Sequence, residues 1–223
     1  MWPTPTGTLH PMDIGPVLDQ LRLNGWATGI GDPSELSSSL LSRGLGPAAT
    51  QRGHPRQILR PMTTGEAPAM SLSAHFGLDA QPLHTDGAHL RHPPEVIALH
   101  STTPNRTPTL LWSPTERGMT PWLPEFAQVG VFTVRNGRDS FLASAAEGAH
   151  VRFDPVCMSP ADDSARQTVA YFAALEPVSV EWDRPDMFLL FDNRKCLHAR
   201  AAVEAGDEER QLERRTYRWE TPQ

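Results

Sequence analysis

Residues 186–200 read DMFLLFDNRKCLHAR, and the interpretation of the fold starts from this stretch. Residues 187–191 are a continuous apolar run, which is typical of a strand buried on both faces. Asp192 and Asn193 follow as turn residues. Beyond the turn, a second strand would carry Cys196, His198 and Arg200 on one face, because alternate side chains of a strand share a face. The stretch therefore predicts two buried strands that present a histidine to the protein interior.

The same pattern of short apolar runs between turn residues covers most of the chain after residue 70. It predicts further strands at residues 96–101, 107–112, 129–134 and 178–182, with weaker candidates at 141–145 and 150–153. Helical spacing of apolar residues predicts helices at 12–24, 34–41 and 162–175, and residues 44–68 read as a loop. The 22 prolines among 223 residues argue against a helical bundle.

These elements predict one α+β domain over residues 1–223. Its expected core, at about residues 71–220, is a double-stranded β-helix of the jelly-roll or cupin-like kind, flanked by N-terminal helices, with residues 1–11 as a loose leader. Net charge is −6, from 20 Lys+Arg against 26 Asp+Glu, so a nucleic-acid partner is not expected. No apolar run approaches the length of a membrane span, and residues 1–11 lack the features of a signal peptide. With only two cysteines, the chain is expected to be cytoplasmic with reduced thiols.

An H-x-D sequence at residues 84–86 is the first candidate for chemistry. In an extended segment His84 and Asp86 point to the same face, so an imidazole and a carboxylate can bind one cation from adjacent corners. Chance alone supplies about half an H-x-D in a chain of this composition. A histidine that is merely hydrogen-bonded to a nearby carboxylate therefore remains an alternative.

His198 can supply a third metal ligand from its inward-facing strand. Two histidines and one carboxylate on one face of an octahedral ion are typical of non-haem Fe(II) oxygenases, and three positions stay open for substrate and dioxygen. Zinc prefers a four-coordinate site, and spacing alone leaves it open. At the C-terminus, alternation in residues 214–219 (RRTYRW) places Arg214 and Arg218 on one face, where a guanidinium can bind a dianionic acid through two hydrogen bonds. The alternative is a solvated basic tail.

Taken together and in this order, the segments resemble the TauD/TfdA (clavaminate-synthase-like) family of Fe(II)/2-oxoglutarate-dependent dioxygenases, over about residues 71–219. The family's H-x-D matches within the context LSAHFGLDAQPLHTDG at residues 72–87, and residues 192–200 (DNRKCLHAR) are similar to its DNR…LHGR segment. The resemblance implies that the iron ligands are His84, Asp86 and His198.

The resemblance also implies a site for 2-oxoglutarate. Thr109, within TPTLLW at residues 107–112, matches a family threonine that helps to hold the distal carboxylate. The family's C-terminal arginines match Arg214 and Arg218, with Arg218 as the preferred partner of that carboxylate. An acidic insert at residues 204–213 lengthens the gap after His198. The choice therefore stays open among four arginines: Arg210, Arg214, Arg215 and Arg218.

By resemblance, the chain is expected to be an enzyme that uses Fe(II), 2-oxoglutarate and dioxygen to hydroxylate a small molecule, such as an amino acid or another polar metabolite. The co-substrate would be decarboxylated to succinate and CO2. Candidate substrate contacts are Arg200, Ser73 and Arg60. Two other interpretations remain open at this point: a cupin-like metal protein that uses the same ligands without 2-oxoglutarate, and a catalytically silent β-roll binding module.

Overall fold

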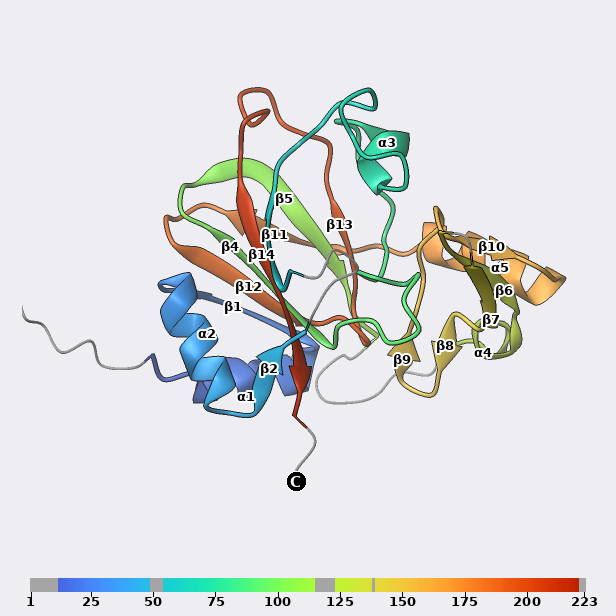
Figure 1. Cartoon of the computed structure of the whole chain (residues 1–223), viewed down its shortest axis with the longest axis horizontal. Helices are drawn as coiled ribbons and strands as arrows, with labels where there is room; N and C mark the ends of the chain where they lie inside the picture. The colour runs from blue at the N-terminus through green and yellow to red at the C-terminus, as the bar shows by residue number, and fades with distance from the viewer. Residues whose placement is uncertain (1–11, 49–53, 115–122, 138, 221–223) are drawn as a thin grey trace, which may run out of the picture.

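The largest sheet is built around the predicted strands at residues 96–101 and 187–191, which lie side by side at its centre (Figure 1). The computed structural model describes residues 12–48, 54–114, 123–137 and 139–220. All neighbouring strands of this sheet run antiparallel. In spatial order they are β1 (Trp26–Ile30), β12 (Met187–Asp192), β4 (Val96–Ser101), β14 (Leu212–Trp219) and β2 (Leu45–Pro47), with β3 (Arg56–Leu59) beside the first half of β14.

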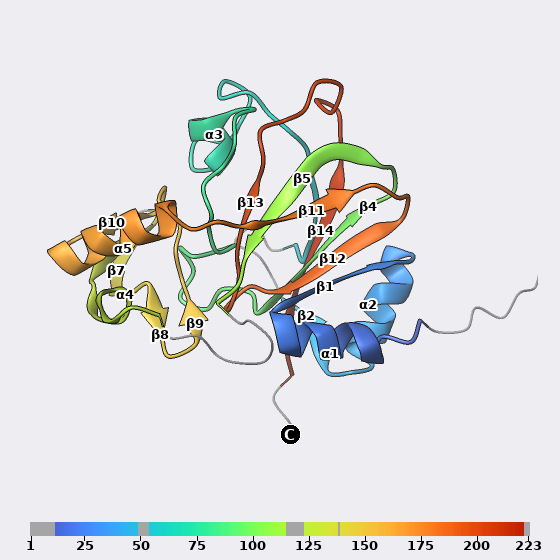
Figure 2. The same ribbon diagram turned by 180° about the vertical axis from the view of Figure 1, so that it is seen from behind.

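A second, three-stranded antiparallel sheet packs on one face of the large sheet (Figures 1 and 2). Its spatial order is β11 (Val178–Trp182), β5 (Asn105–Trp112) and β13 (Leu197–Arg200). Buried side chains from both sheets meet between them, among them Leu111 and Trp182 from the small sheet. This interface is one of the hydrophobic cores of the protein.

Strand β12 is buried along its whole length because both of its faces are covered. Leu189 and Phe191 point into the core between the sheets. Phe188 and Leu190 point the other way, into a cluster shared with the N-terminal helices. The continuous apolar run in the sequence is thus the signature of a central strand with two dry faces.

Helices α1 (Gly15–Asn24) and α2 (Pro33–Leu41) cover the outer face of the large sheet, as Figure 1 shows. Asp32 caps α2, since its side chain accepts two backbone N–H hydrogen bonds at the start of the helix. Gly25 ends α1 with a φ of 82°. A Cβ at this position would lie 2.8 Å from Sγ of Cys196, so only glycine lets the end of α1 approach the turn between β12 and β13 this closely.

Seven further elements gather at one side of the molecule, beside β13 (Figure 1). They share a hydrophobic cluster that contains Phe132, Phe153 and Phe172 and reaches Leu197 and Ala199 of β13. These elements are α4 (Glu125–Val129), β6 (Phe132–Asn136), β7 (Asp139–Ala143), β8 (Ala146–Glu147), β9 (His150–Val151), β10 (Met158–Pro160) and α5 (Asp163–Ala173).

Most of the predicted elements are confirmed. The strands at 96–101 and 178–182 have the predicted bounds, the strand at 187–191 is one residue longer, and helices occupy the three predicted regions. Mostly antiparallel sheets with few helices agree with the predicted α+β class. Among the described residues, none of the helices has the length and apolarity that crossing a bilayer requires. The predicted leader at 1–11 lies outside the described residues.

Two predictions about local structure are wrong. Residues 44–68 are not all loop, because they contain β2 and β3, whose strand state comes from pairing with β14 rather than from their own residues. The strand predicted at 129–134 is the end of one element and the start of another. Val129 is the last residue of α4, which packs on α5 through buried Ala127, and β6 begins at Phe132.

Candidate metal centre and its cavity

The two candidate metal histidines lie directly opposite each other on neighbouring backbone segments. The backbone N–H of His84 donates to the carbonyl of His198 at 2.9 Å, and the reverse hydrogen bond has the same length. In such a pair both side chains leave the backbone on the same face. The two ring centroids are 4.3 Å apart, and both side chains are buried.

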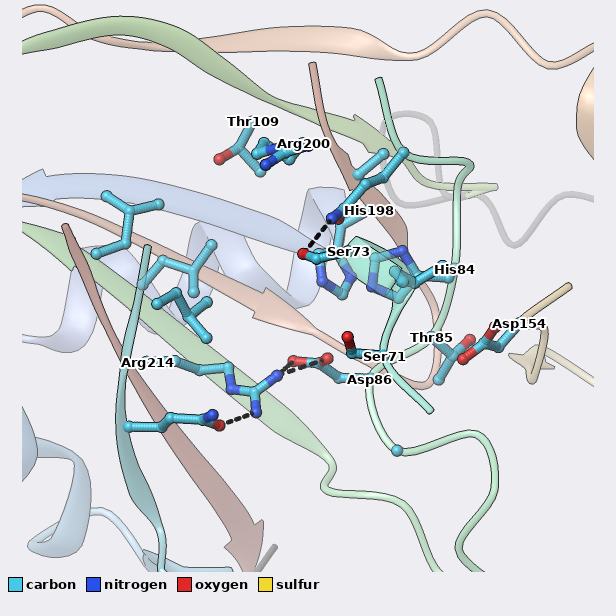
Figure 3. A pocket seen from close by; sticks show the side chains of 18 of the residues that line it. Ser71, Ser73, His84, Thr85, Asp86, Thr109, Asp154, His198, Arg200 and Arg214 are labelled. Atoms are coloured by element: carbon cyan, nitrogen blue, oxygen red, sulfur yellow. Dashed lines mark hydrogen bonds and ion pairs between the residues drawn. The ribbon is translucent and has the colours of Figure 1, made fainter. Parts of the chain in front are cut away.

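Asp86 completes the cluster. One ligand atom each from His84, Asp86 and His198 lies within 4.8 Å of the others, and Figure 3 shows the three side chains around one point. Asn193, in the turn after β12, fixes the backbone of Asp86. Its Oδ1 accepts from the Asp86 N–H at 2.9 Å, and its Nδ2 donates to the Asp86 carbonyl at 3.0 Å. The sequence marked Asn193 only as a turn residue, yet it connects the turn after β12 to the H-x-D segment.

Asp86 is ionised in this environment. Burial raises the pKa of its carboxyl group, but Arg214 and the two imidazoles lower it by more, to about 2. Nη1 of Arg214 lies 2.8 Å from each carboxylate oxygen of Asp86, and the Asp86 side chain is 12% exposed. The carboxylate is therefore available as an anionic ligand at any pH near neutrality.

The surroundings of both imidazoles suit metal ligation. Burial and the neighbouring His84 together lower the pKa of His198 to about 3, against the opposite effect of Asp86. A neutral imidazole has the free lone pair that a metal needs. Nδ1 of His84 lies 3.0 Å from the Pro82 carbonyl. A hydrogen bond to that carbonyl places the proton on Nδ1 and leaves Nε2 free to ligate.

The residues present fit a metal ion. Nδ1 of His198 is buried and has no hydrogen-bond partner within the described part of the chain. Such an atom carries an energetic cost that a bound cation nearby would offset. Two imidazole nitrogens and one carboxylate oxygen form the donor set that suits non-haem Fe(II), with positions left open for other ligands.

A cavity of about 340 Å³ opens beside the cluster. This volume lies within the range of small-molecule sites. The three candidate ligands line it, as do five of the six other predicted site residues: Arg60, Ser73, Thr109, Arg200 and Arg214.

Two of the three substrate candidates, Arg60 and Ser73, lie on different elements beside this cavity. Arg60 is exposed and directly follows β3. Ser73 belongs to the short helix α3 (Leu72–Phe76), and its Oγ accepts from Nε2 of Gln81 at 3.3 Å. Both residues are therefore placed where a molecule in the cavity could reach them.

Thr109 has a hydroxyl group that is free to donate into the cavity. Its Oγ1 accepts a hydrogen bond from Nε1 of Trp182 at 3.2 Å. Because the indole N–H is only a donor, the hydroxyl proton of Thr109 is left for another acceptor. Buried Trp182 thereby orients this threonine, a role that the sequence did not reveal.

Arg218 does not line the cavity, contrary to the preferred prediction. It is exposed, and its Nη2 donates to the carbonyl of His92 at 3.0 Å. The predicted alternation is correct, since Leu212, Arg214 and Thr216 of β14 all face the cavity. Arg218 lies too far along the same strand, however, at roughly 13 Å beyond Arg214 for a rise of about 3.3 Å per residue.

Arg210, another of the four candidate arginines, does line the cavity. Its Nη1 donates to Oδ1 of Asn105 at 3.0 Å and to the carbonyl of Thr107 at 2.8 Å. Burial and nearby Arg200 together lower the pKa of Arg210 to about 10, whereas Asp207 acts in the opposite direction. Arg210 was one of the four candidate arginines from the sequence. Nothing in the sequence favoured it over the others, because Arg210 precedes β14 and strand alternation does not apply there.

Several polar residues of the cavity were not among the predicted site residues, including Gln57, His89 and Asp154. Gln57 of β3 accepts from Nη2 of Arg214 at 2.5 Å, and β3 itself was not predicted. His89 and Asp154 line the same cavity. Nε2 of His89 is buried and has no partner among the described residues, and burial lowers the pKa of this imidazole while Asp154 raises it. Only the nearness of His89 to the H-x-D could have drawn attention to it.

Comparison with known proteins shows the fold. No family model matches the chain, and no curated protein matches it. Among solved structures, the non-heme iron oxygenase OrfP in complex with Fe and alpha-ketoglutaric acid aligns with a TM-score of 0.66 and 17% sequence identity, over 92% of this chain and 80% of OrfP. An asparagine oxygenase in complex with Fe(II), 2S,3S-3-hydroxyasparagine and succinate aligns with a TM-score of 0.65 and 16% identity, over 90% and 77% of the two chains.

A third structure, the PvcB protein from Pseudomonas aeruginosa, aligns with a TM-score of 0.59 and 17% identity, over 89% of this chain and 77% of PvcB. At such identities the likeness establishes the architecture and leaves the chemistry to be argued from the site. The chain is therefore similar in fold to solved non-heme iron oxygenases, and its buried His–Asp–His cluster opens on a cavity large enough for small molecules.

Proposed function

We propose that the protein is an Fe(II)- and 2-oxoglutarate-dependent oxygenase that hydroxylates a small molecule. The observation that carries this proposal is the convergence of His84, Asp86 and His198 within 4.8 Å at a cavity that arginines also line. The structural neighbours support it, because OrfP and the asparagine oxygenase were solved with iron and with alpha-ketoglutaric acid or succinate.

In this proposal His84, Asp86 and His198 hold the iron. When bound, Fe(II) and 2-oxoglutarate supply the oxidation, in which dioxygen is reduced, the 2-oxo acid yields succinate and CO2, and a substrate hydrogen is replaced by hydroxyl. The chain keeps the imidazole of His198 neutral and Asp86 ionised, and it buries both histidines.

Thr109 and Arg210 are the residues that we assign to the distal carboxylate of 2-oxoglutarate. Both line the cavity, and the hydroxyl proton of Thr109 is available. Arg210 donates only to neutral oxygens, Oδ1 of Asn105 and the Thr107 carbonyl, so its charge has no hydrogen-bonded anion within the described part of the chain. A buried charge is stable only when it is paired, and a carboxylate would pair it.

Arg214 is the residue that we assign to the substrate. It lies on the opposite side of the histidines from Thr109 in Figure 3, so one molecule bound at the metal can reach Thr109 while another reaches Arg214. An arginine can bind the carboxylate of an amino acid through two parallel hydrogen bonds. The products solved with the neighbours, 3-hydroxyasparagine and (3S)-hydroxy-L-Arg, are hydroxylated amino acids. An amino acid is therefore the substrate class that we favour.

Three finer points belong to the same proposal. We assign the chain to the TauD/TfdA branch of these oxygenases because of its H-x-D and DNRKCLHAR segments. We take the two packed antiparallel sheets as a double-stranded β-helix core within a single domain. A cytoplasmic location is supported by Cys157 and Cys196, which are both buried free thiols.

Anaerobic titration tests the proposed function. Addition of Fe(II) and then 2-oxoglutarate to the chain should produce the weak visible charge-transfer band of an iron–2-oxo acid chelate. His84→Ala should abolish the band, and His150→Ala, which changes an exposed histidine, should preserve it. Absence of the band in the unaltered protein, with iron and 2-oxoglutarate both in excess, would refute the proposal.

A further inference from the structure

Arg200 lies directly opposite Thr109 across the small sheet. The two residues are register partners in the antiparallel pairing of β13 with β5. Side chains of directly opposed residues share a face and have Cβ atoms roughly 5 Å apart. His198, two positions earlier on β13, faces the same way, and both His198 and Arg200 line the cavity. Figure 3 shows Arg200 next to Thr109, on the same side of the histidines.

The hydrogen bonds of Arg200 occupy only part of its guanidinium. Nη2 donates to the carbonyl of Gly77 at 2.6 Å and to that of Asp79 at 2.7 Å. Nε is buried and has no partner among the residues that the structure describes. A guanidinium group has five N–H donors in a fixed planar arrangement. Donors therefore remain free after the hydrogen bonds to the two carbonyls are made.

Arg200 and Arg210 form a pair of like charges on the cavity wall, and the pKa of Arg210 is lowered by burial and by the charge of Arg200. Their hydrogen bonds go to neutral oxygens, and none of the ion pairs found among the described residues includes either arginine. The carboxylates of Asp79 and Asp207 act on them only through longer-range charge interactions. Two cations in a partly desolvated cavity repel each other, and this arrangement becomes favourable when an anion lies between them.

We propose that Arg200 is a second cationic contact to the distal carboxylate of 2-oxoglutarate, and that together with Arg210 it makes the site select a dicarboxylic 2-oxo acid. The inference rests on the proposed function. A carboxylate has about four lone-pair positions, enough to accept from the Thr109 hydroxyl and from two guanidinium groups. A monocarboxylic 2-oxo acid would leave both cations unpaired in the cavity, and this cost is the source of the selectivity.

A purely structural role is the competing explanation for Arg200. Its bonds to Gly77 and Asp79 tie the loop after α3 to the strand that carries His198. If that were its only role, its removal would disturb the metal site for any 2-oxo acid. The two explanations therefore differ in whether the effect depends on the distal carboxylate of the ligand.

The test compares 2-oxoglutarate with 2-oxopentanoate, which has the same chain length but no distal carboxylate. Anaerobic titration of the iron-loaded protein, followed by the charge-transfer band, gives a Kd for each acid. Arg200→Gln should raise the Kd of 2-oxoglutarate about tenfold, as the loss of a charged hydrogen bond does, and leave the Kd of 2-oxopentanoate unchanged. Arg166→Gln, at an exposed position of α5, is the control for loss of an arginine.

Arg200→Lys separates charge from structure. It keeps a cation near the carboxylate but cannot reproduce both carbonyl bonds of the planar guanidinium. It should retain more 2-oxoglutarate affinity than Arg200→Gln, and it serves as the test variant if the glutamine variant does not fold.

Equal weakening of both acids in Arg200→Gln, or no weakening of 2-oxoglutarate, would overturn the proposal. If Arg200→Gln does not weaken 2-oxoglutarate binding but Arg210→Gln does, the proposed function stands without the role of Arg200. Absence of the band in the unaltered protein would instead refute the proposed function itself.

Discussion

The two ends of the cavity carry arginines in different states. At one end, Arg214 donates to both oxygens of Asp86 and to Gln57, so its charge is already balanced by an anion of the protein. At the end where Arg200 opposes Thr109, the hydrogen bonds of Arg200 and Arg210 go only to neutral oxygens. A ligand that binds Arg214 must share or replace the existing hydrogen-bond partners of this arginine. A ligand carboxylate beside Thr109 would instead supply the anionic partner that Arg200 and Arg210 lack. The difference suggests a preorganised co-substrate end and a substrate end that rearranges on binding.

The largest effect is expected at the metal cluster between the two ends. Asp86→Ala removes the only anionic ligand, and it leaves Arg214 without its carboxylate partner. Hydroxylation should fall to the background of the assay, measured as succinate release and substrate oxidation. His150→Ala should retain full turnover, because this exposed histidine lies outside the cavity. Full turnover in Asp86→Ala would contradict the ligand assignment.

A matched pair of variants tests the difference between the two ends directly. Arg210→Gln should raise the Kd of 2-oxoglutarate by roughly 10- to 100-fold, because a charged hydrogen bond contributes about 1.5–3 kcal/mol. Arg214→Gln should leave that Kd unchanged and raise the KM of the substrate. Anaerobic titration and steady-state kinetics provide the two readouts. The reverse pattern would exchange the roles of the two ends.

The acid sensitivity of the metal-free protein is a smaller effect of the same cluster. Burial depresses the pKa of His198 to about 3, from an ordinary value of 6.5, so between these pH values the unfolded chain binds one more proton than the folded chain. Above the ordinary pKa of His198, its contribution to the free energy of unfolding is fully present. As the pH drops from that value toward 3, the free energy of unfolding falls by about 1.4 kcal/mol per pH unit. Urea unfolding at several pH values should show this slope.

His198→Gln provides the reference for that slope, since glutamine does not titrate. The difference in slope between the two proteins isolates the contribution of His198 from that of other groups, including Asp86, whose depressed pKa acts in the same direction but only below its ordinary value of 3.8. Identical slopes in the two proteins would mean that His198 is not held neutral by burial.

The smallest effect is expected at Arg218. This side chain is exposed and donates to the carbonyl of His92, outside the cavity. Arg218→Gln should therefore leave the Kd of 2-oxoglutarate unchanged, as measured by the same titration. A loss comparable to that of Arg210→Gln would restore the prediction made from the sequence.

The position of Arg218 outside the cavity shows which parts of the site can be predicted from sequence and which cannot. Residue spacing was sufficient for the H-x-D face and for the inward direction of His198, because both follow from strand geometry. Alternation also gave the correct face for Arg214. It could not say where along β14 the cavity ends, and it could not place Arg210 in the preceding turn.

The strands of the fold also differ in how far the sequence predicts them. Strands β4, β11 and β12 are rich in apolar residues and were predictable, since each buries side chains in the core between the sheets. Strands β2 and β3 carry no such signal, and they form because β14 offers them an edge for pairing. The opposition of Arg200 to Thr109 is a matter of register between β13 and β5, which depends on the packed structure.

A crystal structure of the protein with Fe(II) and 2-oxoglutarate, grown without oxygen, tests the central claim most directly. The account predicts one iron bound by His84, Asp86 and His198, with the distal carboxylate of 2-oxoglutarate beside Thr109 and Arg210. A metal bound elsewhere, or a distal carboxylate held by Arg214, would contradict it.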